Sequence, residues 1–205
     1  MASSSAAAGV PLDPIDADRA RLFGLLGRLV TAPPDLALLQ GLAGLGGGFG
    51  AGPLGQAFDA LAAAAARTTP AAAERAHFAL FVGVGRGELL PYASYYLTGF
   101  LHERPLAELR ATLAGLGIVR AAGMVEPEDH LGFCCEVMAG LLEGRFPGGS
   151  ADAFFARHLA PWAGRCFADL AKAEGAGEAA AFYRAVGQLG CVALEIEQDA
   201  AALPA

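Results

Sequence analysis

The sequence lacks the segments that would carry a protein into or across a membrane. Residues Met1 to Val10 contain neither arginine nor lysine and no long apolar run, so they do not form a secretory signal. The longest candidate membrane stretch, His77 to Val84, is far shorter than the roughly 20 apolar residues that a spanning helix needs. We therefore expect a cytoplasmic protein that stays where it is made.

Cysteines are few, and their spacing argues against the usual metal and disulfide frameworks. They are Cys134, Cys135, Cys166 and Cys191, and no two of them form a C-x-x-C pair. Adjacent cysteines point to different parts of a helix surface and seldom pair with each other. We expect four free, mostly buried thiols and no bound metal ion or other cofactor.

Positive charge is also scarce, because the formal net charge is −7. An acidic protein of this size does not attract a phosphate backbone, so nucleic acid is an unfavourable partner. An acidic surface can instead steer a basic peptide or a basic protein toward it. A solvated acidic surface explains the same net charge without any partner, so the charge alone leaves both interpretations open.

Strand-favouring patterns are sparse, whereas helix signals run along most of the chain. Hydrophobic residues make up 55% of the sequence, and much of that fraction is alanine, the best helix former. Leu22, Leu25, Leu26 and Leu29 recur at helical spacing. We predict a flexible leader over 1–14 and a single-domain, all-α helical bundle over 15–205. The expected helices run from Asp16 or Asp18 to Pro33, then over 35–42, 54–66, 71–82, from Ser94, 105–116, 129–142, from Asp152, and 178–201.

Two short segments hold the residues best suited to binding or to catalysis. Pro91 to Phe100 carries three tyrosines and a phenylalanine, which suit either a core or a peptide groove. Glu126 to His130 carries three acids before the clearest amphipathic helix. Acids in a first helical turn complement the positive end of the helix, so a purely structural interpretation is available. The alternative is a place where an arginine and an apolar segment dock together.

Catalysis by the same residues is an alternative with little support. Ser94, Asp129 and His130 supply the residue types of a hydrolytic triad, but no G-x-S-x-G elbow surrounds Ser94. Asp129 and His130 are sequence neighbours whose side chains diverge. We therefore predict no enzyme and no catalytic residue. The alternative hypotheses are a helical enzyme that uses Asp129 and His130 as acid and base, and a helical subunit that only docks to a partner.

Taken together, the motifs resemble those of the TorD/DmsD/NarJ family of redox-enzyme maturation chaperones. The resemblance covers roughly Phe78 to Glu197, and the N-terminal third matches only in helical character. Its strongest feature is an E-P-x-D-H signature over Glu126 to His130, about thirty residues after the tyrosine-rich stretch. The matching stretches are Leu90-Pro91-Tyr92-x-Ser94-x-Tyr96-Leu97-Thr98-Gly99-Phe100-Leu101, Pro105-Leu106-x-x-Leu109-Arg110, Phe154-Phe155-x-x-His158-Leu159-x-Pro161-Trp162 and Phe182-Tyr183-x-x-Val186-Gly187.

That resemblance implies an all-helical chaperone for a molybdopterin-containing enzyme. Such a protein binds the twin-arginine signal peptide of the precursor, and often its body, and holds it until the cofactor is inserted. The expected peptide-binding residues are Pro91, Tyr92, Ser94, Tyr96, Gly99, Phe100, Glu126, Asp129 and His130. Among the acids we expect Asp129 to matter most, with Glu126 and Glu128 projecting further into water.

The sequence leaves the client enzyme and the oligomeric state open. Formate dehydrogenases and trimethylamine N-oxide or dimethyl sulfoxide reductases are all compatible clients. The glycine-rich loop over 44–55 and the long connections favour exchange of helices between chains, so a homodimer is one expected form.

Overall fold

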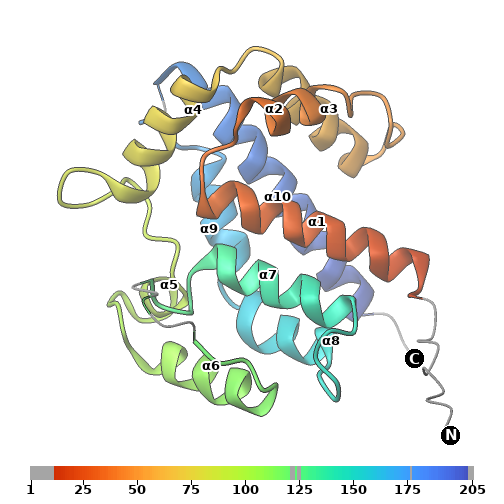
Figure 1. Ribbon diagram of the computed structural model, residues 1–205, viewed down its shortest axis with the longest axis vertical. Coiled ribbons are helices and arrows are strands. Elements are labelled where there is room, and N and C mark those ends of the chain that lie inside the picture. The colour runs from red at the N-terminus through yellow and green to blue at the C-terminus, as the bar shows by residue number, and fades with distance from the viewer. Residues whose placement is uncertain (1–11, 121–122, 124–125, 176, 203–205) are drawn as a thin grey trace, which may run out of the picture.

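The regular structure of the chain is helical (Figure 1), which confirms the predicted all-α class. The computed structural model describes residues 12–120, 123, 126–175 and 177–202. Residues 1–11 of the predicted leader lie outside this part of the chain. The elements are α1 (Pro14–Thr31), α2 (Leu36–Ala43), α3 (Pro53–Ala65), α4 (Pro70–His77), η1 (Phe78–Val82), α5 (Ala93–Thr98), α6 (Arg104–Gly115), α7 (Leu131–Leu142), α8 (Ala151–Phe154), η2 (Phe155–Leu159), α9 (Ala163–Leu170), η3 (Gly177–Ala179) and α10 (Ala180–Ala201).

The first helix begins earlier than its sequence signals suggested. Asp13 caps α1 by accepting a hydrogen bond from the backbone N–H of Ile15 at 2.7 Å, and Pro14 opens the helix. The prediction that Asp16 or Asp18 would cap this helix was wrong. Because proline suits the first helical position, the cap falls just before Pro14, and Asp16 is left to pair with Arg19 three residues along α1.

Helices α1 and α7 lie side by side across the middle of the molecule (Figure 1). Two glycines let their backbones approach closely. A Cβ atom at Gly27 would lie 2.9 Å from the carbonyl oxygen of Gly132, and one at Gly132 would collide with Thr31 Oγ1. Real Cβ atoms do not approach backbone oxygen this closely, so the helix pair depends on glycine at both positions.

The longest helix, α10, packs against α1, α3 and α9 and closes the core from behind in the view of Figure 1. Its buried face includes Phe182, Tyr183, Val186 and Leu189. The largest fully buried side chains of the described residues are aromatic rings and leucines that meet around this helix, among them Trp162, Tyr183, Phe23, Phe167 and Phe182. Burial of such rings is the main favourable contribution to folding.

The cysteines follow the prediction made from their spacing. All four are free, with Cys134, Cys135 and Cys166 buried and Cys191 half-buried. Burial raises the pKa of the Cys134 and Cys135 thiols above the ordinary value, which keeps them protonated. The part of the chain that the structure describes contains no helix both long and apolar enough to cross a membrane.

Candidate functional site

The two segments that stood out in the sequence meet at one place. Tyr92 and His130 form an isolated antiparallel bridge. Its hydrogen bonds run from Ala93 N–H to the Asp129 carbonyl at 2.9 Å and from Leu131 N–H to the Pro91 carbonyl at 2.7 Å. The start of α5 is therefore joined to the start of α7, and we call this place the α5–α7 junction. It gathers Pro91, Tyr92, Ser94, Glu126, Asp129 and His130.

Asp129 holds α5 from across the junction. Its side chain is fully buried, and its Oδ2 accepts hydrogen bonds from Ser94 N–H at 2.8 Å and from Ser94 Oγ–H at 2.6 Å. Tyr92, at the N-cap position of α5, supplies no side-chain cap of its own. Asp129 therefore satisfies an N–H group that the helix start leaves free. The helix predicted to start at Ser94 begins one residue earlier, at Ala93, so Ser94 lies inside the first turn rather than at the cap.

One oxygen of this carboxylate has a different environment. Asp129 Oδ1 is buried and has no hydrogen-bond partner within the described residues. A buried acceptor without a partner costs about 1–3 kcal/mol. The turn before α7 therefore places a costly polar atom beside the apolar core.

His130 caps the helix that follows it. Its Nδ1 accepts a hydrogen bond from the Gly132 N–H at 3.2 Å, so in this arrangement the ring is a neutral imidazole. The ring packs edge-on against Tyr92, with 5.3 Å between the ring centroids. Burial lowers the pKa of His130 below its ordinary value. His130 thus acts as a rigid support beneath Tyr92.

The acids on either side of Pro127 differ sharply in exposure. Glu126 is exposed and accepts a hydrogen bond from the Tyr92 hydroxyl. Glu128 is only 6% exposed, so the expectation that it would project into water was wrong. Its Oε2 accepts hydrogen bonds from Arg110 Nε at 3.0 Å and Arg110 Nη2 at 2.8 Å. Arg120 approaches its other oxygen at 3.8 Å.

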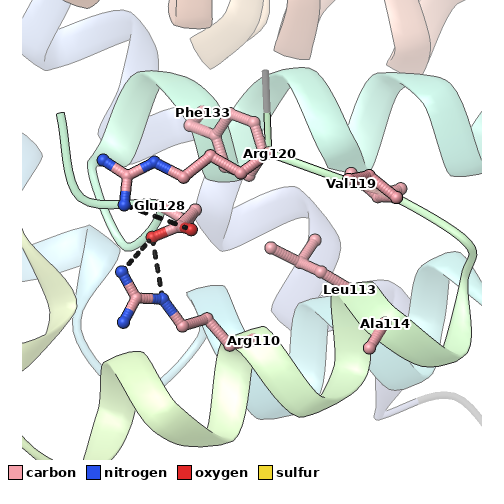
Figure 2. Close-up of a pocket in the computed structure, with 8 residues that line it drawn as sticks. Arg110, Leu113, Ala114, Val119, Arg120, Glu128 and Phe133 are labelled. Carbon is pink, nitrogen blue, oxygen red and sulfur yellow. Dashed lines mark hydrogen bonds and ion pairs between the residues drawn. The ribbon is translucent and has the colours of Figure 1, made fainter. Parts of the chain in front are cut away.

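Figure 2 shows Arg110 and Arg120 reaching Glu128 from opposite sides of a small pocket. The pocket encloses about 170 Å³, and Leu113, Val119 and Phe133 form part of its apolar wall. Burial raises the pKa of Glu128, but the hydrogen bonds from Arg110, a backbone hydrogen bond and the positive charges of Arg110 and Arg120 together outweigh it, so the pKa lies below the ordinary value. No pocket was predicted at this place. Two of its lining residues, Arg110 and Glu128, do lie in the motif stretches of the sequence.

The far end of α5 presents an apolar surface. Phe100 is 70% exposed, and Leu97 and Leu101 are also exposed. Gly99 ends the helix with a positive φ of 83°, a conformation that glycine adopts without strain and that turns the chain so that Phe100 points outward. We call Leu97, Phe100 and Leu101 the α5 apolar patch.

Tyr96 anchors the same helix to α9. Its hydroxyl donates to Asp169 Oδ2 at 2.8 Å, and its carbonyl accepts a hydrogen bond from Arg165 at 2.8 Å. The Tyr96 ring packs against Trp162 at 5.7 Å between centroids. Together with Asp129, these contacts fix α5 at both ends.

The side chains of the α5–α7 junction do not form a nucleophile–base pair. Ser94 donates its hydroxyl proton to Asp129, and His130 Nδ1 accepts from a backbone N–H, so a serine activated by histidine is not assembled. Within the described ranges, no group of three or more His, Cys, Asp or Glu side chains is arranged to hold a metal ion. The arrangement is suited to binding and positioning.

A family model matches the part of the chain that contains this site. The family described as "nitrate reductase delta subunit" matches residues 51–168, which include the α5–α7 junction. No curated protein matches the sequence significantly. A crystal structure from Archaeoglobus fulgidus, provisionally described as a redox enzyme maturation protein, is 19% identical, with a TM-score of 0.47 over 81% of this chain and 91% of that one.

The molecule is thus a helical redox-enzyme maturation chaperone. The chain belongs to the nitrate reductase delta subunit family, the family of NarJ and TorD type that its motifs resemble. Members of this family act on precursors of nitrate reductase-type molybdoenzymes and are chaperones rather than catalysts.

Proposed function

We propose that this chaperone binds the twin-arginine signal peptide of a molybdopterin-containing oxidoreductase precursor in the cytoplasm. It also contacts the body of that precursor and holds it until the cofactor is inserted and export begins. The observation that carries the proposal is the composition of the surface around α5. An exposed carboxylate, Glu126, lies at one end of a six-residue helix and the α5 apolar patch lies at the other.

The dimensions of α5 suit a peptide that is basic and then apolar. A helix rises 1.5 Å per residue, so α5 spans roughly 9 Å between its two ends. An extended chain covers that distance in about three residues. An arginine paired with Glu126 is therefore within reach when apolar side chains a few residues further along contact Leu97 and Phe100. The net charge of −7 favours the approach of such a cationic segment.

The buried members of the junction support this surface from below. Ser94, Asp129 and His130 have little or no exposed area, so in our proposal they position α5 and Tyr92 rather than contact the peptide. Glu128 is likewise engaged with Arg110. This leaves Tyr92, Glu126 and Phe100 as the expected direct contacts.

Isothermal titration with a twin-arginine signal peptide from a nitrate reductase-type precursor tests the proposal. Phe100→Asp places a carboxylate in the α5 apolar patch and is expected to weaken binding by at least about tenfold. Val84→Asp is the control for an added surface carboxylate, because Val84 is 98% exposed and is not part of the α5 apolar patch, and it is expected to leave the affinity unchanged.

Two outcomes would count against this assignment. If the peptide does not bind the wild-type protein at all, signal recognition itself is wrong. If it binds wild type and Phe100→Asp equally, recognition stands but the peptide docks away from α5. Circular dichroism of each variant checks that the fold is intact.

A further inference from the structure

A second and larger hollow lies between α1, α3 and α10. It encloses about 480 Å³, within the range of roughly 300–1,000 Å³ that is usual for binding pockets. Its walls are largely apolar and come from three helices, and its charged lining residues are Asp18 paired with Arg21, and Arg19 paired with Glu197. Leu22 and Leu25 come from α1, Leu54 and Phe58 from α3, and Ala193 and Ile196 from α10. We call it the α1–α10 groove, and it shares no lining residue with the pocket of Figure 2.

One edge of this groove comes from the glycine-rich connection between α2 and α3. Phe49 lies in this connection, is 45% exposed, and stacks on Phe58 with 3.9 Å between ring centroids. Gly47 and Gly50 flank it with φ values of 76° and 75°, which only glycine adopts without strain. The connection therefore adds a partly exposed aromatic face to the apolar wall of the groove.

The charges beside the groove favour a basic occupant. Arg19 contacts three carboxylates, at 2.6 Å from Asp16, 2.6 Å from Glu197 and 3.4 Å from Asp152, so three negative charges face one positive charge. The Asp152 side chain is 83% exposed and Asp16 is partly exposed. A lysine or arginine flanking an apolar segment therefore meets uncompensated negative charge there.

Most of the residues that line the groove lie outside the segment that the family model matches. That match covers residues 51–168, which leaves out α1, Phe49 and α10. The α5–α7 junction, to which we assign the signal peptide, lies wholly inside it. The two places are therefore built from largely different parts of the chain.

We propose that the α1–α10 groove binds an amphipathic helix of the mature body of the precursor. The apolar stripe of that helix packs on Leu22, Leu25 and Ile196, and a basic residue at its edge lies beside Asp152. This is the helix-in-groove mode of recognition, in which side chains at i, i+3, i+4 and i+7 fill one hollow. The identity of the partner rests on the proposed function, but the site is separate from the α5 apolar patch.

Two probes and two variants separate this inference from the proposed function. The probes are a nitrate reductase-type apo-precursor without its signal peptide and the isolated signal peptide. Ile196→Asp alters the groove at a residue that is 42% exposed and so leaves the core intact. It is expected to weaken binding of the signal-less precursor by at least about tenfold and to leave signal-peptide affinity unchanged. Phe100→Asp is expected to show the reverse pattern.

Each other outcome overturns the inference in a distinguishable way. If the signal-less precursor binds wild type and Ile196→Asp equally, the groove is not its binding site, and the proposed function still stands. If neither probe binds the wild-type protein, both the groove inference and the proposed function are wrong. A wild-type dimer that Ile196→Asp converts to a monomer, measured by sedimentation velocity, assigns the groove to a second copy of this chain. Val84→Asp is again the control.

Discussion

Asp129, Glu128 and Glu126 lie within four residues of one another but have three different environments. Asp129 is buried against Ser94, Glu128 is buried against Arg110, and Glu126 reaches solvent beside Tyr92. The sequence predicted that Asp129 would matter most to a ligand and that Glu126 and Glu128 would project further into water; Glu126 does reach solvent, but Glu128 is buried and Asp129 is fully buried. The backbone bridge between Tyr92 and His130 explains the difference, because it turns Asp129 underneath α5.

Replacing Asp129 tests its role as a cap. Asp129→Ala removes the acceptor for Ser94 N–H and Oγ–H, and a hydrogen bond to a charged group contributes about 1.5–3 kcal/mol. We expect the free energy of unfolding, measured by urea denaturation, to fall by about 2 kcal/mol. Asp129→Asn keeps one carbonyl acceptor and should restore part of that loss. A folded Asp129→Ala protein of unchanged stability would contradict the capping role.

The same substitution affects peptide binding only through the position of α5. We expect Asp129→Ala to weaken signal-peptide affinity by about ten- to a hundredfold, because loss of the cap displaces Tyr92 and Phe100. The rescue variant separates the two mechanisms. If Asp129→Asn restores both stability and affinity, the carboxylate acts by positioning; if it restores stability alone, the charge of Asp129 contacts the peptide.

Replacing Glu126 should affect peptide binding but not stability, unlike replacing Asp129. Because it is exposed, Glu126→Gln should leave the unfolding free energy unchanged. An exposed ion pair is worth about 0.2–1 kcal/mol, so signal-peptide affinity should fall by less than about fivefold. The difference from wild type should shrink as sodium chloride is raised, since salt screens exposed charges. Titrations at low and high salt measure both effects.

At the scale of helices, local sequence signals predicted where most elements lie but not what holds them together. The stripe at Leu131, Cys134, Cys135 and Met138 predicted α7, and proline and glycine marked most boundaries. The cap of α5 could not be found this way, because Asp129 is supplied from 35 residues away. Arg110, Arg120 and Glu128 also come together only through packing of α6 against the turn before α7. Periodicity identifies a buried face but not its partner.

The contact of α1 with α7 offers a test at this scale. Gly132→Ala inserts a methyl group against Thr31 and the carbonyl of Gly27, where neither helix can give way easily. We expect a loss of about 1–3 kcal/mol in the unfolding free energy, typical of overpacking. Gly41→Ala in α2 is the matched control. Its Cβ would meet nothing within 4 Å, so removing an exposed helical glycine should stabilise the protein by about 0.4–1 kcal/mol.

At the scale of the whole molecule, an ion pair joins the first helix, α1, to the last helix, α10. Arg19 on α1 donates Nε to Glu197 Oε1 at 2.8 Å and Nη2 to Glu197 Oε2 at 2.6 Å, a bidentate pair with α10. The Glu197 side chain is only 6% exposed, so its carboxylate has little contact with water and is held by this partner.

Arg19→Met should therefore cost about 3–5 kcal/mol, because it leaves a buried carboxylate unpaired. Arg21→Met is the control, since Arg21 and Asp18 are both more than two-thirds exposed and their pair is worth little. The double variant Arg19→Met, Glu197→Met should recover much of the stability, as replacement of a whole buried pair by apolar groups often does. A single variant as stable as wild type in urea would contradict a structural role for the pair.

The buried histidines make the stability of the whole molecule depend on pH. Burial lowers the pKa of His77, His130 and His158 below the ordinary value near 6.5, and that of His158 to about 4. The unfolded chain therefore binds more protons than the folded chain between roughly pH 6.5 and pH 4. The neutral histidines should not reduce the unfolding free energy above about pH 6.5. The unfolding free energy should fall as the pH drops toward 4, where the imidazole of His158 becomes protonated inside the fold. Thermal denaturation followed by circular dichroism should show a steadily lower Tm over this interval.

His158 bonds Thr112 Oγ1 at 2.8 Å, a contact that the amide of His158→Gln can replace, so this variant should lose part of the pH dependence while staying folded. His102→Gln, at an exposed loop position, should follow the wild-type curve. A wild-type Tm that is constant from pH 7 to pH 4.5 would contradict the requirement that these rings stay neutral.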